Sequence, residues 1–389
     1  MRKYKLINNV LGWVVFLIAS TVYLMTIEPT ASFWDCGEFI SSAFKLEVGH
    51  PPGAPFFMLT ANLFTQLASD TSMVAKMVNS MSALFSGLTI LFLFWSITHL
   101  ARKIMVNDED EISLGKMITI MGSGLVGALA YTFSDTFWFS AVEGEVYAYS
   151  SLFTALVFWL ILKWEEAADR PHADRWIVLI AYLMGLSIGV HLLNLLCIPA
   201  IVLVYYYKKF PNPTMKGTIY ALLVSFAIVG LMMYGVVQGL VEVCGYFELL
   251  FVNVLGMPYN SGVFAYVIAL SGVLIWAIWE TMRDEINPTR MKIAFIVAIV
   301  LVGVPFIGSG YVIAVILTAA LTAYLFMSKK VNIKLLNTIL VCLMVIVVGY
   351  SSYALTMIRA TADTPMNQNA PSDIFTLRSY LAREQYGKT

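Results

Sequence analysis

The chain has 389 residues, of which 59% are hydrophobic and only 12% are charged, and its formal net charge is zero. Soluble domains carry about 25% charged residues, so the composition excludes an ordinary soluble protein and indicates an integral membrane protein. The neutral balance argues neither for nor against nucleic-acid binding. Because the long apolar runs lack the alternation of barrel strands, the expected fold class is an all-α polytopic membrane protein.

The chain begins with Arg2, Lys3 and Lys5 before an apolar run over residues 10–27, a start that resembles a secretory signal peptide. The run is too long for a signal peptide and no small-residue cleavage site follows it, so we expect a retained first helix. Residues 28–73 are then predicted to form a structured first outer loop. Within it, the apolar run over 54–67 is short for a span and is predicted to be re-entrant or interfacial.

Further apolar segments predict a bundle of about eleven transmembrane helices. With the N-terminus in the cytoplasm, 18 of the 24 Lys and Arg residues fall on cytoplasmic segments, as the positive-inside rule expects. Treating 54–67 as a full span would reverse every later loop and remove this bias. The expected spans are 10–27, 74–100, 117–133, 146–162, 176–190, 192–207, 218–240, 263–282, 293–306, 311–327 and 335–358.

The composition changes abruptly after residue 358. Residues 359–389 contain a polar, Pro-containing linker followed by a short amphipathic helix pattern. We therefore expect a transmembrane domain over 1–358 and, over 359–389, an outer-side linker and short helix that lead into a soluble region. The predicted orientation also places the loops at 135–145, 189–191 and 242–262 on the outer face.

Ionisable and polar residues gather at these outer loop edges rather than inside the predicted spans. Ion-coupled transporters usually carry buried charges near mid-membrane, so this distribution favours a site at the outer membrane surface. The first loop holds the densest group, with Phe33, Trp34, Phe39, Ile40 and Phe44 forming an apolar side that suits the membrane interface. The candidate residues are Asp35, Glu38, His50, Lys76, Glu143, Glu145, Tyr147, His191, Asn194 and Arg359.

Several of these candidates have a structural alternative. Asp35 and Glu38 lie three apart, on one face of a helix if the segment that holds them is helical, but the same spacing resembles a capping box. His50 before Pro51 can satisfy a turn. The remaining alternatives are a solvated loop for Glu143 and Glu145, helix ends for His191 and Asn194, and interfacial snorkelling for Lys76 and Arg359.

Six motifs together resemble the protein O-mannosyltransferase-like family, of the GT-C class of membrane glycosyltransferases. They are W-D-C-G-E-F at 34–39, G-H-P-P-G-A-P at 49–55, K-M-V-N-S-M-S-A-L at 76–84, E-G-E-V-Y at 143–147, G-V-H-L-L-N at 189–194, and the tail P-M-N-Q-N-A-P…Y-L-A-R-E-Q-Y-G. The resemblance extends over nearly the whole chain, and the combination of the first two motifs is the most specific part.

The resemblance implies a GT-C-like bundle in the bacterial inner membrane, with a cytoplasmic N-terminus and a periplasmic C-terminus. It implies transfer of a sugar, with mannose as the first choice, from a polyprenyl-phosphate carrier to Ser or Thr hydroxyls of an acceptor protein. Asp35 is implied to be the catalytic base and Glu38 its partner. No cofactor is evident; some GT-C relatives use a divalent metal, and none is assigned here. The other implied roles are substrate binding by His50, Glu143, Glu145, Tyr147, His191 and Asn194, and carrier-phosphate binding by Lys76 and Arg359.

The chemistry of the residues agrees with an inverting transfer. A hydroxyl is a weak nucleophile that benefits from a positioned base, and a phosphate leaving group is stabilised by a nearby cation. The alternative class is a non-enzymatic membrane component, either a flippase for a lipid-linked sugar or an anchor for a soluble region. Movement of carrier lipid across liposomes without an acceptor would distinguish that class from an enzyme.

Overall fold

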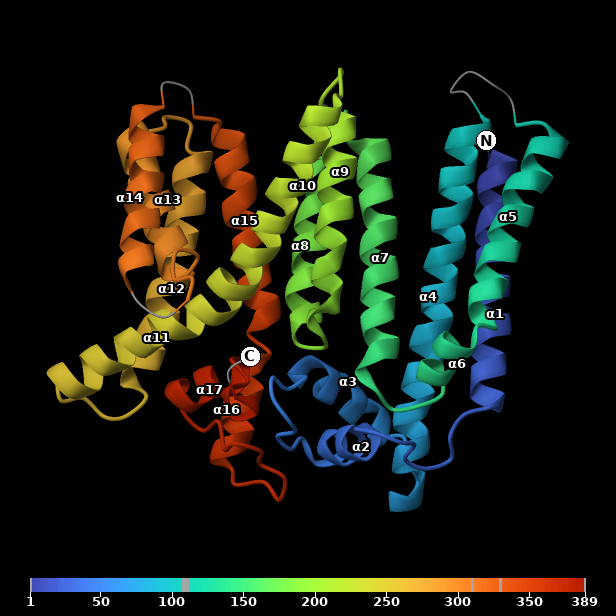
Figure 1. Cartoon of the computed structure of the whole chain (residues 1–389), viewed down its shortest axis with the longest axis horizontal. Coiled ribbons are helices and arrows are strands. Elements are labelled where there is room, and N and C mark those ends of the chain that lie inside the picture. Colours follow the sequence, from blue (N-terminus) through green and yellow to red (C-terminus); the bar gives the residue numbers. More distant parts are fainter. Residues whose placement is uncertain (1, 107–111, 309–310, 329–330, 388–389) are drawn as a thin grey trace. The chain divides into compact units, whose positions relative to one another are not determined.

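The computed structural model describes residues 2–106, 112–308, 311–328 and 331–387, and these residues form helices and connecting loops without an extended strand (Figure 1). This confirms the all-α polytopic fold class. The positively charged residues Lys329, Lys330 and Lys388 of the topology prediction lie outside the described residues. The chain divides into two compact units, which are described separately. Unit 1 is Met1–Gly49, Ala54–Trp176 and Ser187–Lys208, and unit 2 is His50–Gly53, Ile177–Leu186 and Lys209–Thr389.

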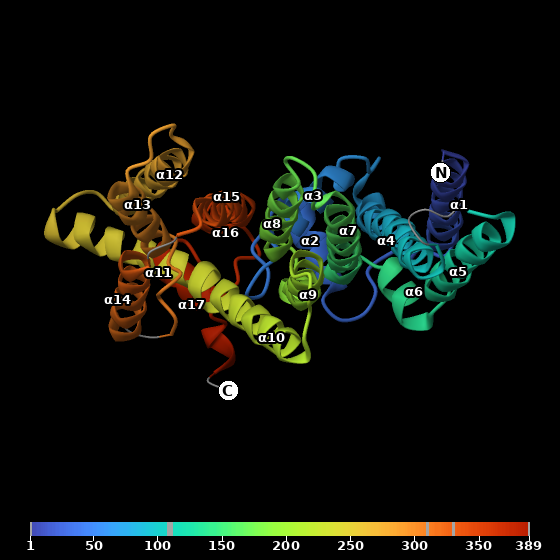
Figure 2. The ribbon, with the colours of Figure 1, turned by 90° about the horizontal axis from the view of Figure 1, so that it is seen from above.

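Unit 1 is organised around α4 (Val74–Met105), which packs against α1 (Arg2–Met25), α5 (Leu114–Thr132) and α7 (Val146–Ala167), as the view from above also shows (Figure 2). With 32 residues, α4 is about 48 Å long and exceeds the roughly 30 Å of bilayer hydrocarbon. The helix therefore extends beyond the apolar layer, and its end turns can carry polar residues.

The first loop folds as a helix pair in unit 1. After α2 (Cys36–Lys45), the helix α3 (Pro55–Thr65) packs back on α2 and on α4, and both lie across the lower ends of α4 and α7 in Figure 1. At 11 residues, α3 is about 17 Å long, too short to cross the bilayer. The structured first loop is thus confirmed. The short helices of this unit are η1 (Thr71–Met73), α6 (Asp135–Ala141) and η2 (Leu192–Cys197), the last continuing into α9 (Ile198–Lys209).

Unit 2 contains a helical run that is longer than predicted. It passes through α10 (Met215–Gly230), the π-helix η3 (Leu231–Gln238), α11 (Gly239–Leu249) and the π-helix η4 (Leu250–Val254). The prediction of a loop over 242–262 is therefore wrong for most of its length. The residues up to 254 are apolar enough to continue the helix, and the break comes where Gly256 adopts a φ of +65°.

The rest of unit 2 packs around α12 (Ser261–Met282), which contacts α11, α13 (Pro288–Leu301) and α15 (Ile333–Tyr350). The helix predicted over 335–358 is broken after Tyr350. The remaining elements are α14 (Tyr311–Met327), α16 (Tyr353–Thr361), α17 (Ile374–Leu381) and η5 (Glu384–Tyr386). Of these, α17 packs against α11. The residues of α8 (Asp174–Ile188) are divided between the two units.

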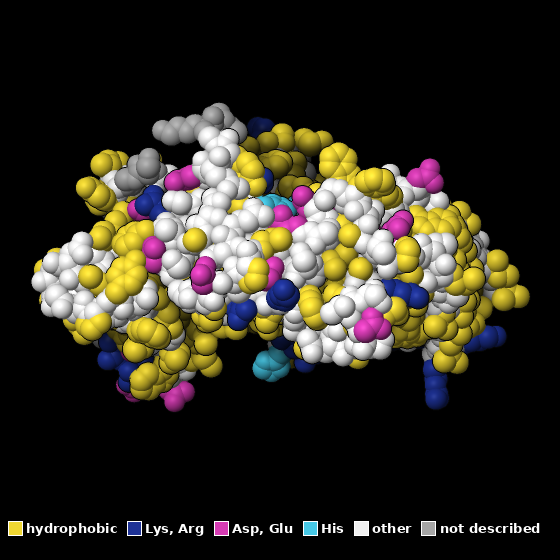
Figure 3. All heavy atoms as spheres, turned by 90° about the horizontal axis from the view of Figure 1, so that it is seen from below, with side chains coloured by type: hydrophobic (Ala, Val, Ile, Leu, Met, Phe, Trp, Pro, Cys, Tyr) yellow, Lys and Arg dark blue, Asp and Glu magenta, His cyan; other side chains and the backbone are white. Residues whose placement is uncertain are grey.

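Eight helical segments of the described residues are long and apolar enough to cross a membrane. Three further predicted spans are helical but short, with 15 residues in α8, 14 in α13 and 17 in α14. The predicted number of eleven transmembrane helices therefore stays a prediction. Hydrophobic side chains cover the flank of unit 1 where α1 and α5 lie, at the right of Figure 3. The exposed hydrophobic residues of these two helices include Leu17 and Val126. Such a surface suits contact with lipid.

Candidate functional site

Asp35 lies where the first loop turns into α2. It occupies the N-cap position, but its exposed side chain makes no capping hydrogen bond to the described α2 backbone. The capping-box alternative is therefore not supported. Trp34, just before it, has a φ of +59°, which is uncommon for a bulky residue and directs the chain into the helix.

The apolar side of the first loop is divided between the core and the surface. Phe39 and Ile40 are buried, and the Phe39 ring lies 5.3 Å from that of Phe57 on α3. Their predicted place at the membrane interface is wrong, because α2 uses this face to pack against α3. Phe33 and Trp34 are instead 75% and 88% exposed. The two rings beside Asp35 are thus the ones available to lipid or substrate.

Glu143 and Glu145 are buried, with exposed fractions of 4% and 6%, so the solvated-loop alternative is wrong. Gly144 between them explains how the turn comes so close to the helices. A Cβ there would lie 2.9 Å from Asn79 Oδ1 and 3.0 Å from the Ile40 side chain. The turn therefore packs directly on α2 and α4. The Glu145 carboxylate also accepts a hydrogen bond from the Val146 amide at the start of α7.

Glu143 connects the residues on either side of Asp35. Its carboxyl accepts hydrogen bonds from the side chains of Ser32 and Cys36, and its Oε2 atom is buried without a partner among the described residues. Burial raises the pKa of Glu143, and the two hydrogen bonds partly oppose this rise. The sequence did not reveal this contact, because no spacing rule relates residue 143 to residues 32 and 36.

Several acidic residues lie close to the Cys36 thiol at the start of α2. Its pKa is raised mainly by burial and further by the carboxylates of Glu143, Glu145 and Asp35. Three acidic residues from two loops therefore lie within electrostatic range of one thiol. A thiol with a raised pKa is a poor nucleophile, so Cys36 acts as a hydrogen-bond donor in this site.

Asn79 fixes the entrance to the loop. Its fully buried side-chain amide donates hydrogen bonds to the carbonyl oxygens of Glu28 at 2.8 Å and Thr30 at 3.0 Å. The Glu28 amide in turn donates to the Val142 carbonyl oxygen at 3.1 Å. The start of the loop is thus attached to α4 and to the segment that precedes Glu143. A polar amide near the end of an apolar span was the only sequence signal for this role.

Tyr147, on the first turn of α7, is 47% exposed, and its ring lies 5.5 Å from that of His191. Glu145 and Asp35 are both within electrostatic range of this phenol. His191 Nδ1 accepts a hydrogen bond from the Leu193 amide, so the histidine begins η2 as its alternative role suggested. Asn194 is fully buried and donates to the Ser187 hydroxyl at 2.9 Å.

Glu38 and Lys76 belong to the same unit but lie in different surroundings. Glu38 is half-buried against the end of the loop, where a Cβ on Gly49 would lie 2.5 Å from Glu38 Oε1. An alanine at position 49 would therefore force the flexible end of the Glu38 side chain to move. Lys76 is exposed near the start of α4.

His50 and Arg359 belong to unit 2. The His50 carbonyl oxygen accepts a hydrogen bond from the Tyr380 hydroxyl at 3.2 Å, and the Gly53 carbonyl oxygen accepts one from the Tyr353 hydroxyl at 3.4 Å. The Pro-Pro-Gly turn is therefore held by α16 and α17. Arg359 is half-buried in the last turn of α16.

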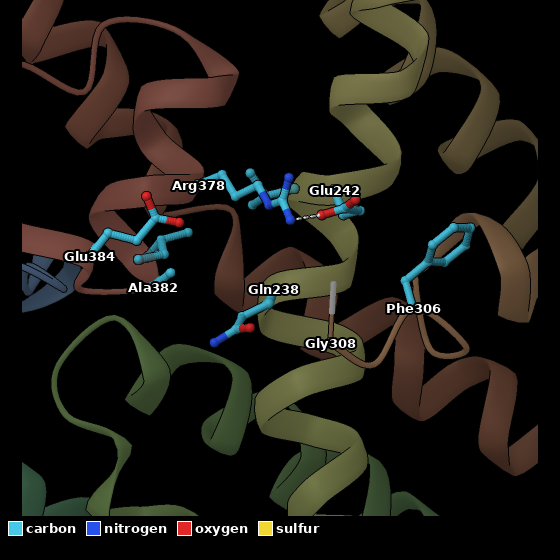
Figure 4. A pocket seen from close by; sticks show the side chains of 9 residues that line it. Gln238, Glu242, Phe306, Gly308, Arg378, Ala382 and Glu384 are labelled. Atoms are coloured by element: carbon cyan, nitrogen blue, oxygen red, sulfur yellow. Dashed lines mark ion pairs between the residues drawn. The ribbon is translucent and has the colours of Figure 1, made fainter. Parts of the chain in front are cut away.

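A cavity of about 180 Å³ lies in unit 2 between α11 and the residues of the tail (Figure 4). Arg378 of α17 forms an ion pair of 2.6 Å with Glu242 of α11, which also accepts a 2.6 Å hydrogen bond from the Tyr246 hydroxyl. Gln238 and Glu384 line the same cavity. Sequence reasoning placed Glu242 in a loop and therefore missed this pair.

Among the described residues, no group of three or more His, Cys, Asp and Glu side chains has the arrangement of a metal site. The absence of an assigned metal and cofactor stays a prediction. The arrangement in unit 1 is an exposed carboxylate with a buried carboxyl beside it and an exposed aromatic pair nearby. Such an arrangement can bind a polar substrate at the membrane surface and accept a proton from it.

Comparisons with known proteins identify relatives of the first half of the chain. Residues 35–214 match the family described as "Protein O-mannosyl-transferase TMEM260 N-terminal domain". The protein O-mannosyl-transferase tmem260 of Dictyostelium discoideum is 27% identical over 186 residues, and that of Mus musculus is 28% identical over 174 residues. No solved structure matches the chain.

These matches confirm the resemblance to an O-mannosyltransferase-like family. They cover 46% and 45% of this chain but only 21% and 22% of the relatives' own lengths. The matched residues include Asp35, Glu143 and His191, whereas the tail motif lies outside them. The similarity therefore concerns the part of the chain that carries Asp35, Glu143 and His191.

Proposed function

We propose that this chain is a membrane glycosyltransferase that transfers a sugar to hydroxyl groups of proteins at the outer membrane surface. The donor is a polyprenyl-phosphate sugar, with mannose as the first choice, and the acceptors are Ser and Thr residues. The observation that carries the proposal is the exposed Asp35 carboxylate, which lies beside buried Glu143 and Glu145 in the family-matched segment. The relatives are named protein O-mannosyl-transferases, which agrees with this reaction class.

Asp35 is the general base in this proposal. It takes the proton from the acceptor hydroxyl as that oxygen attacks the anomeric carbon of the sugar, on the face opposite the leaving phosphate. The bond between the anomeric carbon and the phosphate oxygen breaks, so the anomeric configuration inverts. The role needs an accessible carboxylate, and the exposure of Asp35 meets that need.

Glu143 is a positioning residue in this proposal. Its hydrogen bonds from Ser32 and Cys36 hold the chain on both sides of Asp35. A base must lie within hydrogen-bond reach of its proton, and misplacement by about 1 Å can reduce a rate by about 100-fold. Glu145 adds a second buried carboxylate next to this segment.

The remaining candidates are assigned to the substrates. The exposed ring of Tyr147, with His191 beside it, offers a surface for the sugar or acceptor, and Glu38 is the proposed partner of Asp35. Asn194 is also proposed to act in substrate binding, and because it is fully buried it would do so by positioning the start of η2. His50 is proposed to bind substrate, and either Lys76 or Arg359 is proposed to bind the carrier phosphate, whose developing charge a cation stabilises. We further propose that the protein resides in the bacterial inner membrane with its N-terminus in the cytoplasm and its C-terminus in the periplasm.

The proposal is tested by sugar transfer with purified full chain reconstituted in liposomes. Polyprenyl-phosphate-mannose and a Ser/Thr-rich peptide are supplied, with and without EDTA, to wild type, Asp35→Asn and Asp135→Asn. Asp135 is a matched control, because it is also an exposed aspartate at the start of a short outer helix. We expect Asp35→Asn to lower kcat by about 100-fold to 10,000-fold, as for other general bases, and Asp135→Asn to leave it unchanged.

Equal transfer by wild type and Asp35→Asn would remove Asp35 from the role of base. Movement of labelled carrier lipid across the liposome membrane, without transfer of its sugar to the acceptor peptide, would support a flippase instead. Activity lost in EDTA and restored by a divalent cation would add a metal to the reaction.

A further inference from the structure

A second, larger cavity lies in unit 1 at the end opposite to α2 and α3. It has a volume of about 1300 Å³ and is formed by the last turns of α4 and α7, the first turns of α1 and the segment before α8. These are the upper ends of the helices in Figure 1, where the N-terminus is marked. None of the candidate residues of the proposed reaction lines this cavity, so it calls for a separate explanation.

The cavity is strongly cationic. Seven Lys and Arg side chains line it, against two Glu side chains. Glu165 forms an ion pair with Lys103, and Glu166 forms ion pairs with Arg102 at 2.6 Å and with Lys163 at 3.3 Å. Both carboxylates are thus already matched by cations.

Lys208 pairs with Asp169 at 2.7 Å, which leaves three of the seven cations for a ligand. Lys5, Arg170 and Arg175 line the cavity and form no ion pair with any carboxylate among the described residues. The guanidinium of Arg175 lies over the Trp176 ring, 5.8 Å from its centre. Like charges gathered in a hollow repel one another unless an anion enters, so this arrangement favours an anionic ligand.

A buried histidine gives independent evidence for a ligand. His99 lines the cavity with only 6% of its side chain exposed, and its Nε2 atom has no hydrogen-bond partner among the described residues. The Glu165 oxygen closest to Nε2 is 4.0 Å away, which is too far for a hydrogen bond. Buried polar atoms of this kind normally have a partner, and a ligand oxygen would provide one.

The lower wall of the cavity is aromatic. The ring centres of Trp95 and Trp159 are 5.4 Å apart, and those of Trp13 and Trp95 are 6.3 Å apart. Trp13 lies on α1 and is 49% exposed, so the wall reaches the flank that faces lipid. Tryptophan is typical of the level at which lipid headgroups meet acyl chains. This wall favours a lipid over a soluble anion.

We propose that this cavity binds the phosphate headgroup of an anionic phospholipid from the leaflet on the N-terminal side. The phosphate oxygens contact Arg170, Arg175 and His99, and the acyl chains leave over Trp13 and Trp95. Basic pockets between transmembrane helices on the cytoplasmic side bind lipid headgroups in this manner. The proposal does not depend on the glycosyltransferase reaction.

The test is native mass spectrometry of the purified full chain in detergent, titrated with cardiolipin, phosphatidylglycerol or phosphatidylcholine. Wild type is expected to retain the two anionic lipids in preference to phosphatidylcholine. In Arg170→Gln/Arg175→Gln, binding should weaken by about 30-fold, because each juxtamembrane cation contributes about 1 kcal/mol. The matched control Lys3→Gln/Lys216→Gln also removes two exposed cations, both outside the cavity, and should bind as wild type does.

Arg170→Lys/Arg175→Lys should restore most of the binding, and melting in phosphatidylcholine monitors folding of every variant. If anionic lipid bound equally weakly to the Gln double variant and to the control double variant, general surface charge would explain the effect and the proposal would be overturned. No preference for anionic lipid in wild type would also overturn it. Displacement of bound lipid by millimolar inorganic phosphate, with tight phosphate binding on its own, would assign the cavity to a soluble anion instead.

Discussion

Replacing Glu143 with alanine separates the positioning role of this residue from the chemistry of Asp35. The substitution removes the acceptor for the Ser32 hydroxyl and the buried Cys36 thiol. A buried donor without a partner costs about 1–3 kcal/mol, and the lost side-chain volume adds a cavity term. We expect the free energy of unfolding to fall by about 2–3 kcal/mol and sugar transfer to fall by about 100-fold, because Asp35 loses its fixed position.

Glu143→Gln is the matched variant. The amide keeps the size of the side chain and one acceptor oxygen, so Ser32 and Cys36 can retain their partner. We expect a loss of about 1 kcal/mol in unfolding free energy and transfer activity close to that of wild type. Thermal unfolding in detergent and the liposome transfer assay measure the two quantities on the same preparations.

The pH dependence of stability gives a further test, because burial raises the pKa of Glu143 above its ordinary value of 4.5 in the folded protein. The folded state therefore binds the proton more tightly than the unfolded state. The stability that this contributes is complete below 4.5 and is lost as the pH rises through the raised folded pKa. Glutamine does not titrate, so the stability of wild type minus that of Glu143→Gln should decrease with rising pH.

A stability difference that stays flat or increases with pH would refute a buried, hydrogen-bonded carboxyl at position 143. Full activity of Glu143→Ala at unchanged melting temperature would refute its positioning role. Asp135→Asn controls for the loss of an exposed acid and should change neither quantity.

Three other substitutions follow from the contacts. Asn79→Ala should lower the free energy of unfolding by about 2–4 kcal/mol, because two carbonyl oxygens lose their buried donor; chemical denaturation measures this. Gly49→Ala should displace Glu38 and lower transfer activity, whereas Gly37→Ala, whose Cβ would meet its nearest atom at 3.8 Å, should not; equal effects would contradict the reasoning. Arg378→Gln should cost about 1 kcal/mol by breaking its partly exposed ion pair, and an unchanged melting temperature would show that the pair contributes nothing.

The sequence predicted those features that depend on composition and length. The apolar runs predicted helices, and the short run at 54–67 predicted a non-spanning helix, which is α3. The ionisable residues at loop edges identified Asp35, Glu143 and Glu145 as candidates before their contacts were known. The helix predictions succeed because membrane burial imposes strict limits on length and polarity that a sequence displays directly, whereas the roles of the three acids stay a prediction.

The sequence did not predict which of these acids would be buried. Glu143 and Glu145 looked like a solvated loop, because burial here comes from α2 and α4 closing over the turn at Gly144, and that packing joins residues far apart in the chain. The helix that continues to Val254 was missed for a related reason. Glu242 was predicted to begin a loop because its partner could not be recognised: Arg378 lies 136 positions later in the chain.

The contrast between Asp35 and Glu143 is the strongest argument for the proposed division of roles. Two carboxyl groups that share a site but differ in environment are suited to different tasks. Asp35 is exposed and makes no capping hydrogen bond to the described α2 backbone, so it can contact an incoming hydroxyl and accept its proton. Glu143 is buried, its pKa is raised by burial, and it holds the residues on both sides of Asp35, so it can stabilise the site without contact with substrate. Loss of Asp35 should therefore lower kcat without changing melting, whereas loss of Glu143 should change both.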